Sequence, residues 1–526
     1  MPPPTLNSEE PFKLSQLDYK IQNISRLVRD DSFTPLERVE RAIGKFSRLS
    51  DSEIRTPSQV CDELFHMMPR DRIRTAVLRG EKILDIASKF GEFALAAFKY
   101  LTKIEKLPIE IARAAIFSIP TSPIAYEFTL RFYQLIGLSA ENVASDFSSY
   151  DILRFVNKGD IDVRSVKTLI LTCCPNSHTI DGTEMKFAAV VGNPPFQVGD
   201  GGARASAKPI YHHFVSVAEA IATEVVSLII PTRWYVGGKG LDTFREHMIT
   251  NPHIQVLVDQ LRPETVFPGT NNRGGICYFL LDKQLDNSQT GGVTVNTFDG
   301  SSLRSTVVRS LNTFNSGVFI RDTIGVDIAS RVMAHPSFSP ISDWISSRQP
   351  FHLPGKAESI HGFQDERPVD GGQHIRCFMR RGKVGWVPRA TIYTKVEWID
   401  QWKVMMPYAN NIGTELNDDN QNTFVAPPGS VCTETFLVVG GDLQLSEVQA
   451  LTLSTYLRTR FARFLLSIAK VSQHGTRQTY RFVPKPDLAA LEKWRLEPDQ
   501  MDNYLCDFYG LAEAERAHVS DAISSM

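Results

Sequence analysis

Cysteine is scarce in this chain, with seven residues among 526, and no two of them have the Cys-x-x-Cys spacing typical of zinc ligands or thiol–disulfide exchange. Cys173 and Cys174 are adjacent, and an adjacent pair alone forms neither kind of site. We therefore expect reduced thiols, as in a cytosolic protein, and no bound metal.

Long hydrophobic runs are also missing. No apolar stretch reaches the roughly twenty residues that a membrane-spanning helix needs. The N-terminus, with Pro2 to Pro4 and Glu9-Glu10, lacks the basic and apolar regions of a signal peptide. A net charge of -2 excludes a uniformly basic protein, so a surface that binds nucleic acid must be a local patch. These absences predict a cytoplasmic protein with no membrane partner.

The length predicts more than one domain. A chain of 526 residues with 42% hydrophobic and 22% charged side chains is typical of a soluble globular protein of two or three domains. Short apolar runs lie at 82–86, 115–119, 187–191, 225–230, 254–258 and 275–281. Because helical patterns separate most of these runs, we predict an α/β fold with a largely parallel sheet.

The run at 187–191 ends in an unusual loop. The run has no polar residue and is too short for a helix, which predicts a strand buried on both faces. Gly192 then frees the backbone, and two prolines end the strand. Ligands of open α/β sheets lie at the carboxyl ends of such strands. The loop at 193–196 is therefore a candidate ligand site, although a simple turn would also explain its prolines.

This loop has groups that suit the exocyclic amine of a nucleobase. Such an amine is a poor nucleophile because its lone pair is delocalised into the ring. The Asn193 side-chain oxygen and the Pro194 carbonyl can each accept one amine hydrogen, which draws the nitrogen toward a tetrahedral geometry and exposes its lone pair. Phe196 offers an aromatic face, and stacking of a base on such a face contributes about 1–3 kcal/mol.

A second candidate site follows the run at 82–86. The segment from Asp85 to Gly91 has the composition of the first strand-to-helix turn of a Rossmann-like unit, where a nucleoside ligand lies against the helix N-terminus. Upstream, Thr56-Pro57 predicts a normal helix start, with the threonine as N-cap and the proline at the first helical position.

Together these motifs resemble the Eco57I-like branch of the amino-group DNA methyltransferases, which modify adenine at N6 and have the gamma-type motif order. The resemblance covers roughly residues 55–285 and rests on Thr56-Pro57, the loop at 85–91, the Asn-Pro-Pro-Phe tetrad at 193–196 and the Ile-Ile-Pro-Thr-Arg-Trp run at 229–234. It implies a Rossmann-like domain that uses S-adenosyl-L-methionine and acts on a base flipped out of double-stranded DNA. It also implies that Asn193, Pro194, Pro195 and Phe196 are the catalytic residues.

The same resemblance implies a set of cofactor-binding residues, namely Thr56, Pro57, Asp85, Ala87, Ser88, Gly91 and Asp151. For the carboxylate that binds the cofactor's adenine, Asp146 is an alternative to Asp151. No acid ends the run at 115–119, so the ribose contact stays unassigned. The chain departs from the family at Lys89, where a glycine is usual. This departure leaves a binding protein without catalysis as an alternative function.

The last third of the chain contains two basic windows without an acid. Residues 376–395 contain six Lys and Arg, and residues 456–485 contain seven, on a helix whose other side is apolar. The arginines of that helix are therefore expected to project away from the core. Given the resemblance upstream, we predict a mixed α+β target-recognition domain in this region. Its predicted DNA contacts are Arg380, Arg381, Lys383, Arg458, Arg463, Lys470, Gln473, His474 and Arg477.

We therefore predict an N-terminal helical extension at 1–54, a methyltransferase catalytic domain at 55–290, and a DNA target-recognition domain with C-terminal helices at 291–526. The predicted activity is site-specific DNA adenine-N6 methylation by a bacterial or phage enzyme of the restriction-modification type. Methylation of RNA or of protein glutamine is an alternative, because those enzymes share the Asn-Pro-Pro loop. The residues before Thr56 are too few for a fused nuclease, so a separately encoded restriction endonuclease is the implied partner.

Overall fold

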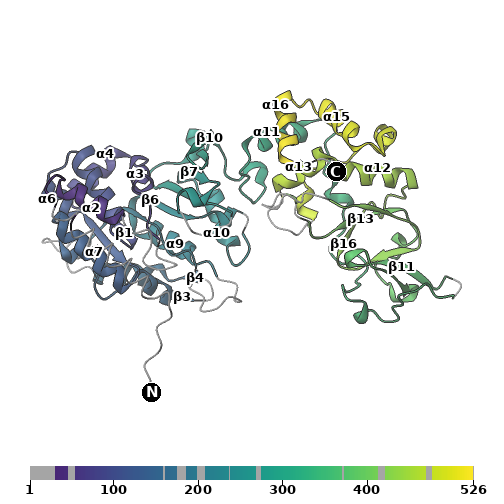
Figure 1. Ribbon diagram of the computed structural model, residues 1–526, viewed down its shortest axis with the longest axis horizontal. Helices are drawn as coiled ribbons and strands as arrows, with labels where there is room; N and C mark the ends of the chain where they lie inside the picture. The colour runs from purple at the N-terminus through teal and green to yellow at the C-terminus, as the bar shows by residue number, and fades with distance from the viewer. Residues whose placement is uncertain are drawn as a thin grey trace, which may run out of the picture. The chain divides into compact units, whose positions relative to one another are not determined.

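The computed structural model describes two compact units, Met1–Phe319 and Ile320–Met526 (Figure 1). The described residues are 26, 30–44, 54–157, 160–173, 185–197, 208–235, 237–267, 274–369, 372–410, 412, 421–469 and 477–524. Among the helices of these residues, none combines the length and hydrophobicity needed to cross a bilayer.

The first unit contains an eight-stranded sheet in the order β10-β9-β7-β8-β6-β5-β1-β2. Its strands are β1 (Lys82–Ser88), β2 (Ile116–Pro120), β5 (Phe187–Gly192), β6 (Ala222–Pro231), β7 (Ile254–Gln260), β8 (Ile276–Asp282), β9 (Val293–Asp299) and β10 (Ser302–Arg309). All six strands predicted from the apolar runs are present. The half formed by β2, β1, β5 and β6 is parallel, as predicted.

The other half of the sheet is mixed rather than parallel. Strand β8 lies between β6 and β7 and is antiparallel to both. Strand β9 is parallel to β7, and β10 is antiparallel to β9.

Helices cover both faces of this sheet, so its central strands are buried on both sides. Neighbouring residues of β1 point to opposite faces, and Ile83 and Leu84 accordingly belong to different hydrophobic clusters. One cluster is formed with α3 (Ser58–His66), α4 (Arg70–Leu78), α5 (Glu92–Lys99) and α7 (Pro123–Ile136). The other is formed with α8 (Val163–Cys173), α9 (Tyr211–Ile221) and α10 (Asp242–Thr250). The described part of the predicted N-terminal extension includes α2 (Pro35–Ile43), which contacts α7.

The boundary between the units lies later than predicted. The Gly-, Ser- and Asn-rich residues at 286–292 suggest a linker in the sequence, but they form the turn between β8 and β9, with Gly291 in the left-handed conformation at φ 81°. Because β9 and β10 continue the sheet, the first unit ends at residue 319 rather than 290.

The second unit has the predicted mixed α+β character. Two small sheets contain β11 (His374–Phe378), β12 (Val384–Pro388) and β15 (Ser430–Cys432), and β13 (Lys403–Pro407), β14 (Phe424–Ala426) and β16 (Phe436–Val439). Its helices are α11 (Thr323–Ala334), α12 (Glu447–Arg458), α13 (Arg460–Ala469), α14 (Leu488–Leu491), α15 (Pro498–Phe508) and α16 (Glu513–Ala522). The predicted C-terminal helices are thus present, and α11 joins them by contacts to α13 and α16.

Candidate active site

The strand order places a topological switch point at the carboxyl ends of β1 and β5, where open α/β sheets form a ligand crevice. These strands are parallel neighbours, yet the helices that follow them pack on opposite faces, with α5 in one hydrophobic cluster and α9 in the other. In open α/β sheets, ligands bind at the point where the chain segments that follow two neighbouring parallel strands leave toward opposite faces of the sheet. The residues that follow β1 and β5 are those of the two motifs predicted to form the site.

Asn193 follows β5 and has one unsatisfied side-chain atom. Its side chain is buried, and its Nδ2 donates a hydrogen bond to Thr56 Oγ1 at 3.1 Å. Its Oδ1 is buried and has no hydrogen-bond partner among the described residues. A buried acceptor without a donor costs about 1–3 kcal/mol, so this oxygen is suited to accept a hydrogen from a ligand.

Thr56 has a different role from the predicted N-cap. Helix α3 begins at Ser58 and has no side-chain cap. The Thr56 hydroxyl instead accepts from Asn193, and the Thr56 backbone N–H donates to Glu92 Oε1 at 3.1 Å. By holding Nδ2, Thr56 orients the Asn193 amide so that Oδ1 is left for a ligand.

Glu92 connects this amide to the loop after β1, and sequence reasoning missed it. Its second carboxylate oxygen, Oε2, accepts from the Phe90 backbone N–H at 3.0 Å, and the side chain is buried. An acid at the first position of a helix is usually explained by its favourable interaction with the helix dipole. The sequence therefore gives no reason to assign Glu92 a more specific role. Here the carboxylate fixes both the loop and the backbone of Thr56.

Asp85 provides a second unsatisfied oxygen in the crevice. Its Oδ1 accepts from the Ala87 backbone N–H at 3.2 Å, whereas its buried Oδ2 has no partner among the described residues. Burial, together with the negative charge of Glu92, raises the pKa of Asp85 to about 8, and this rise is opposed by hydrogen bonds from the Ala87 backbone and the Ser88 side chain and by the charge of Lys89. A ligand with a positive charge or an N–H donor would satisfy Oδ2.

The rest of the loop after β1 is fixed by packing. Gly91 has φ 79°, and a Cβ atom there would lie 2.6 Å from the Phe132 ring, so glycine is needed at this position. The Ser88 hydroxyl pairs with Thr129 Oγ1 at 3.0 Å, which leaves it less available to a cofactor than predicted. Lys89, in place of the usual glycine, is 3% exposed and lies within the protein rather than in solvent.

Asp151 has a local role that the sequence did not predict. It lies in the 3-10 helix Ser149–Phe155, where its Oδ2 accepts from the Ser148 backbone N–H at 2.8 Å and from the Ser148 hydroxyl at 2.9 Å. Its Oδ1 also forms an ion pair with Arg154 at 2.7 Å. Its contact with a cofactor stays a prediction, as does that of Pro57, and the ribose contact is still unassigned.

Phe196 keeps part of its ring accessible. Pro194 and Pro195 are buried, whereas Phe196 is only half-buried and meets Phe267 edge to face, with ring centroids 6.4 Å apart. Its backbone carbonyl accepts from Ile210 N–H at 3.1 Å, which holds the end of the tetrad in place. The tetrad thus presents an unpaired acceptor and an aromatic surface from one rigid loop.

Comparison with known proteins identifies the region that contains this loop. Residues 102–267 match the sequence model of the Eco57I restriction-modification methylases. We refer to these matched residues as the methylase segment. The methylase segment includes the tetrad at 193–196, but it begins after Thr56 and Asp85, so the roles of these two residues rest on the geometry above.

A curated relative of this chain is an uncharacterized adenine-specific methylase of Mycoplasma pneumoniae, which is 30% identical over 156 residues. The alignment covers 28% of this chain and 37% of that relative, so the chain matches little more than a third of its length. Among solved structures, the type IIG restriction endonuclease BpuSI has a TM-score of 0.40 and 11% identity, over 88% of this chain and 63% of that chain. The type ISP enzyme LlaGI in complex with a DNA substrate mimic has a TM-score of 0.46 and 11% identity, over 85% and 46%.

In the second unit, the buried position of Arg463 contradicts the prediction that this residue contacts DNA. Its side chain is 1% exposed, and its guanidinium donates to the carbonyls of Arg458 at 2.8 Å and Ser524 at 2.7 Å. The prediction assumed one continuous helix, but the chain breaks between α12 and α13 at Thr459, which changes the helical phase. Arg463 therefore points inward and satisfies carbonyls at the end of α12.

We expect Arg463→Ala to destabilise the protein without a specific effect on DNA binding. The substitution leaves buried carbonyls without donors, which predicts a loss of roughly 1–3 kcal/mol in the free energy of unfolding. Thermal or urea unfolding measures this loss, and duplex binding at a temperature where the variant is folded is the control. A variant of normal stability that binds DNA more weakly would restore the original assignment.

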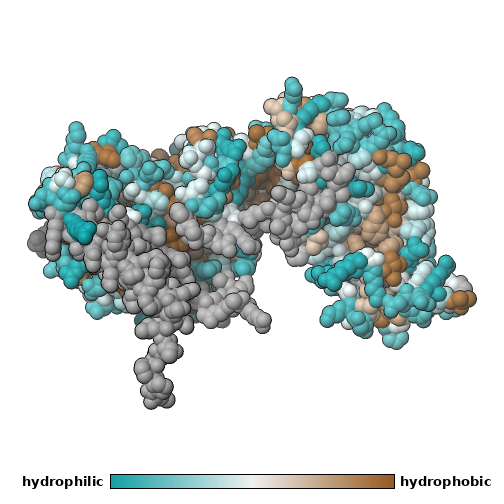
Figure 2. Space-filling view, viewed as in Figure 1, coloured by the Kyte–Doolittle hydropathy of each residue, from teal (hydrophilic) through white to brown (hydrophobic). Residues whose placement is uncertain are grey.

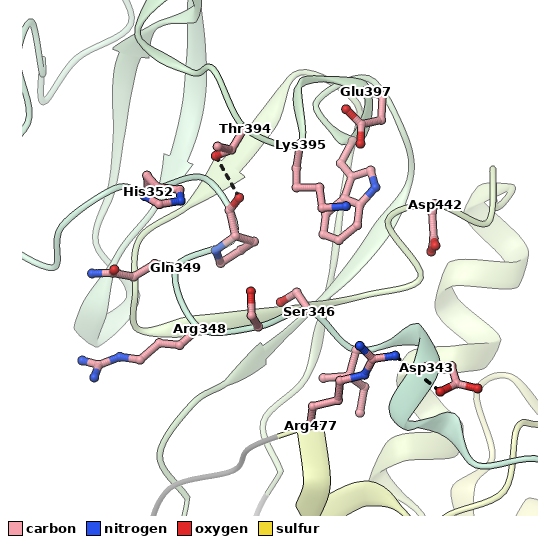
Figure 3. Close-up of a pocket in the computed structure, with 14 residues that line it drawn as sticks. Asp343, Ser346, Arg348, Gln349, His352, Thr394, Lys395, Glu397, Asp442 and Arg477 are labelled. Atoms are coloured by element: carbon pink, nitrogen blue, oxygen red, sulfur yellow. Dashed lines mark hydrogen bonds and ion pairs between the residues drawn. The ribbon is translucent and has the colours of Figure 1, made fainter.

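The structure places the other predicted DNA contacts in four different settings. Lys470, Gln473 and His474 lie outside the described residues. Arg458 is half-buried. Arg477 is exposed, pairs with Asp343 at 3.4 Å, and lines a cavity of about 800 Å³ (Figure 3). Arg380, Arg381 and Lys383 are exposed together at one end of the hairpin formed by β11 and β12.

Proposed function

We propose that this chain is a DNA methyltransferase that transfers a methyl group from S-adenosylmethionine to N6 of a flipped-out adenine at a specific site in duplex DNA. The observation that carries the proposal is the pair of unsatisfied buried oxygens, Asn193 Oδ1 and Asp85 Oδ2, at the adjacent ends of β5 and β1. One suits an amine of a base and the other a cationic group of the cofactor, within a chain that contains a methylase segment.

In the proposed reaction, Asn193 Oδ1 and the Pro194 carbonyl each accept one hydrogen of the adenine amine. This arrangement directs the nitrogen lone pair away from the ring, and Phe196 supports the base by stacking. The residues that would hold the cofactor are Asp85 and the loop up to Gly91. The bound cofactor would supply an electrophilic methyl group and leave as a neutral thioether, while the amine would lose one proton to solvent. The protein contributes mainly by positioning the two reactants.

The target adenine must leave the double helix to reach this site. A base in a duplex is stacked and paired, and extruding it requires a few kcal/mol. The second unit is the proposed source of the DNA contacts that offset this requirement and select the site. A restriction endonuclease encoded separately, with the same target site, is the proposed biological partner.

Sequencing that detects N6-methyladenine, applied to DNA from cells that express the full chain, tests the proposal. We expect methylation of one short sequence motif, absent from cells that express Asn193→Ala.

Lys89, which replaces the family glycine, favours one competing function, a binding protein without catalysis. Unmodified DNA together with tight cofactor binding in calorimetry would support that function instead. Methyl transfer to RNA or to protein glutamine, with DNA unmodified, would identify an RNA or a protein methyltransferase.

We expect Thr56→Val to reduce the methyl-transfer rate roughly 10- to 100-fold, because the Asn193 amide loses the acceptor that orients it. The backbone bond from Thr56 to Glu92 is unaffected by this change, so cofactor affinity should stay within a few-fold. Single-turnover transfer assays and calorimetry measure the two effects.

Thr56→Ser is the matched variant that keeps the hydroxyl, and it should restore the rate. Thr75→Val makes the same replacement on α4, where the hydroxyl bonds only a carbonyl of its own helix, and should be neutral. Full activity of Thr56→Val would remove the orienting role of Thr56.

A further inference from the structure

We propose that the hairpin formed by β11 and β12 enters the major groove of the target duplex and selects the methylation site. This inference rests on the proposed function, because it names the part of the second unit that recognises the DNA substrate. Both predicted basic windows were candidates for this role, and the structure favours the first.

The second basic window is largely committed to the fold of the unit itself. Arg463 is buried and bonded to carbonyls. Arg477 and Lys485 both pair with Asp343, at 3.4 and 3.0 Å, and burial lowers the pKa of Arg481. Among the described residues of 456–485, few cations are therefore left for phosphates or bases.

The hairpin, in contrast, has one face on the core and one face in solvent. Ile375 and Cys377 of β11 and Val387 of β12 are buried in the hydrophobic cluster of this part of the unit. Arg376 is exposed and lies directly opposite Trp386 in the antiparallel register, whereas Phe378 packs against the cluster. The core face holds the ribbon rigid, so its outer face is presented without further ordering.

The outer face combines cations with an aromatic ring. The guanidinium carbons of Arg376 and Arg367 lie 5.8 and 5.1 Å from the centre of the Trp386 ring. Arg367 reaches this position because Gln364 pairs with Trp386 through two backbone hydrogen bonds, of 2.9 and 2.8 Å. A guanidinium group that stacks on an aromatic ring can still donate the N–H groups at its own edge to phosphates or to the edges of bases.

The turn of the hairpin is also basic, and its backbone is unusual. Arg381 has φ 61° and Gly382 has φ 71°, in the left-handed region that glycine adopts easily and arginine does not. An arginine at such an exposed position is held at a conformational cost, and such strain is typical of functional positions. Lys383 lies beside them and pairs with Asp365 at 2.7 Å.

The net charge of this surface fits a polyanion. Among the described residues, Arg367, Arg376, Arg380, Arg381 and Lys383 contribute five positive charges, while the adjacent segment contributes the carboxylates of Asp365 and Glu366. Figure 2 shows that the part of the second unit around β11 is mainly hydrophilic in this view. Duplex DNA matches a local positive patch on a protein whose overall charge is slightly negative.

The dimensions of the hairpin favour the major groove over the minor groove. Paired strands are about 4.8 Å apart, and five residues span roughly 17 Å. Strand β11 is flanked by β15, and β12 is flanked by Gln364, so the part of the hairpin that can enter a groove is its turn at 379–383. The major groove, about 12 Å wide and 8.5 Å deep, admits such a two-stranded turn with its side chains, whereas the minor groove is only about 6 Å wide. Arg380 and Arg381 at the turn would then reach base edges, where arginine pairs best with guanine.

The decisive experiment compares Arg381→Gly with wild type in the full chain. Glycine suits the backbone at this position, so the variant is expected to fold, which a melting curve confirms. We expect roughly 10- to 100-fold weaker binding of the target duplex and relaxed methylation at one or more positions of the site, because an arginine contact to a base is lost. Lys493→Ala, which removes one exposed charge from the C-terminal helices, is the matched control and should change neither.

The outcomes separate this inference from the proposed function. A wild type that methylates DNA, with Arg381→Gly equal to it in both affinity and site choice, overturns the hairpin assignment alone. A wild type that binds duplexes selected from a random-sequence library but methylates none overturns the proposed activity, and Arg381→Gly then tests the hairpin by binding. A wild type that selects no duplex overturns the hairpin assignment.

Discussion

Asn193→Ala is expected to reduce methyl transfer by roughly 10²- to 10³-fold or more, the effect typical of removing one group that stabilises a transition state. The substitution removes the acceptor for the base amine, Oδ1, and leaves Thr56 without its partner. Cofactor affinity should be preserved, because the Asn193 side chain is assigned to the base and not to the cofactor. Radiolabelled methyl transfer under single-turnover conditions and calorimetry with S-adenosylmethionine separate these two quantities.

Gln197→Ala is the matched control for this change. Gln197 is exposed and follows the tetrad directly, so its truncation tests whether any shortened side chain in the loop lowers the rate. We expect it to retain nearly full activity. Equal activity of Asn193→Ala and Gln197→Ala would show that Asn193 only ends a strand, and the proposed chemistry would be wrong.

The fold of the first unit was predictable where local signals were strong. Every apolar run gave a strand, and the run at 187–191 became β5 with only Gly192 added. Strand direction was less predictable, because the position of β8 between β6 and β7 depends on pairing between distant segments. The boundary at 290 was wrong for a related reason, since a polar turn and a linker have the same composition.

The candidate site was predictable in its parts but not in its connections. The tetrad and the loop at 85–91 were identified as separate motifs, and the structure places them at adjacent strand ends. The bond between Thr56 and Asn193 joins residues 137 positions apart, and no local pattern predicts it. Because Thr56 precedes Pro57 in the pattern of a helix N-cap, the sequence predicts that its hydroxyl binds the backbone of the following helix rather than Asn193.

The error at Arg463 has a similar origin. A periodic pattern places residues on a helix face only while the helix is continuous, and the break at Thr459 lies between two segments that each look helical. The break is stabilised by Asp502, whose carboxylate accepts the first N–H groups of α13, from Arg460 and Phe461, at 2.9 and 2.8 Å. A cap supplied by a residue some forty positions away cannot be inferred from the local sequence.

The protonation of Asp85 gives cofactor binding a pH dependence. Its pKa of about 8 means that the carboxyl is mainly neutral in the free protein at pH 7, whereas a cationic ligand group favours the carboxylate. Affinity for S-adenosylmethionine should therefore rise as pH increases toward 8 and then level off, by at most about tenfold per pH unit. The charged and titratable groups around Asp85 are Glu92, which raises this pKa, Lys89, which lowers it, and the buried thiol of Cys61.

Asp85→Ala is expected to weaken cofactor binding by roughly 100-fold or more, because the loop after β1 loses both the bond to Ala87 and the oxygen assigned to the ligand.

Asp85→Asn, a neutral isostere, should lose the rise in affinity between pH 6 and about 8. It should also be more stable than wild type near pH 8. The folded wild type holds a proton that the unfolded chain has released above its usual pKa of 3.8, so wild-type stability falls as pH rises from 3.8 toward about 8. Calorimetric titrations and melting curves over this range measure both effects, with Lys89→Gly as the control expected to bind the cofactor equally or more tightly. Unchanged affinity of Asp85→Ala would move the cofactor away from the end of β1.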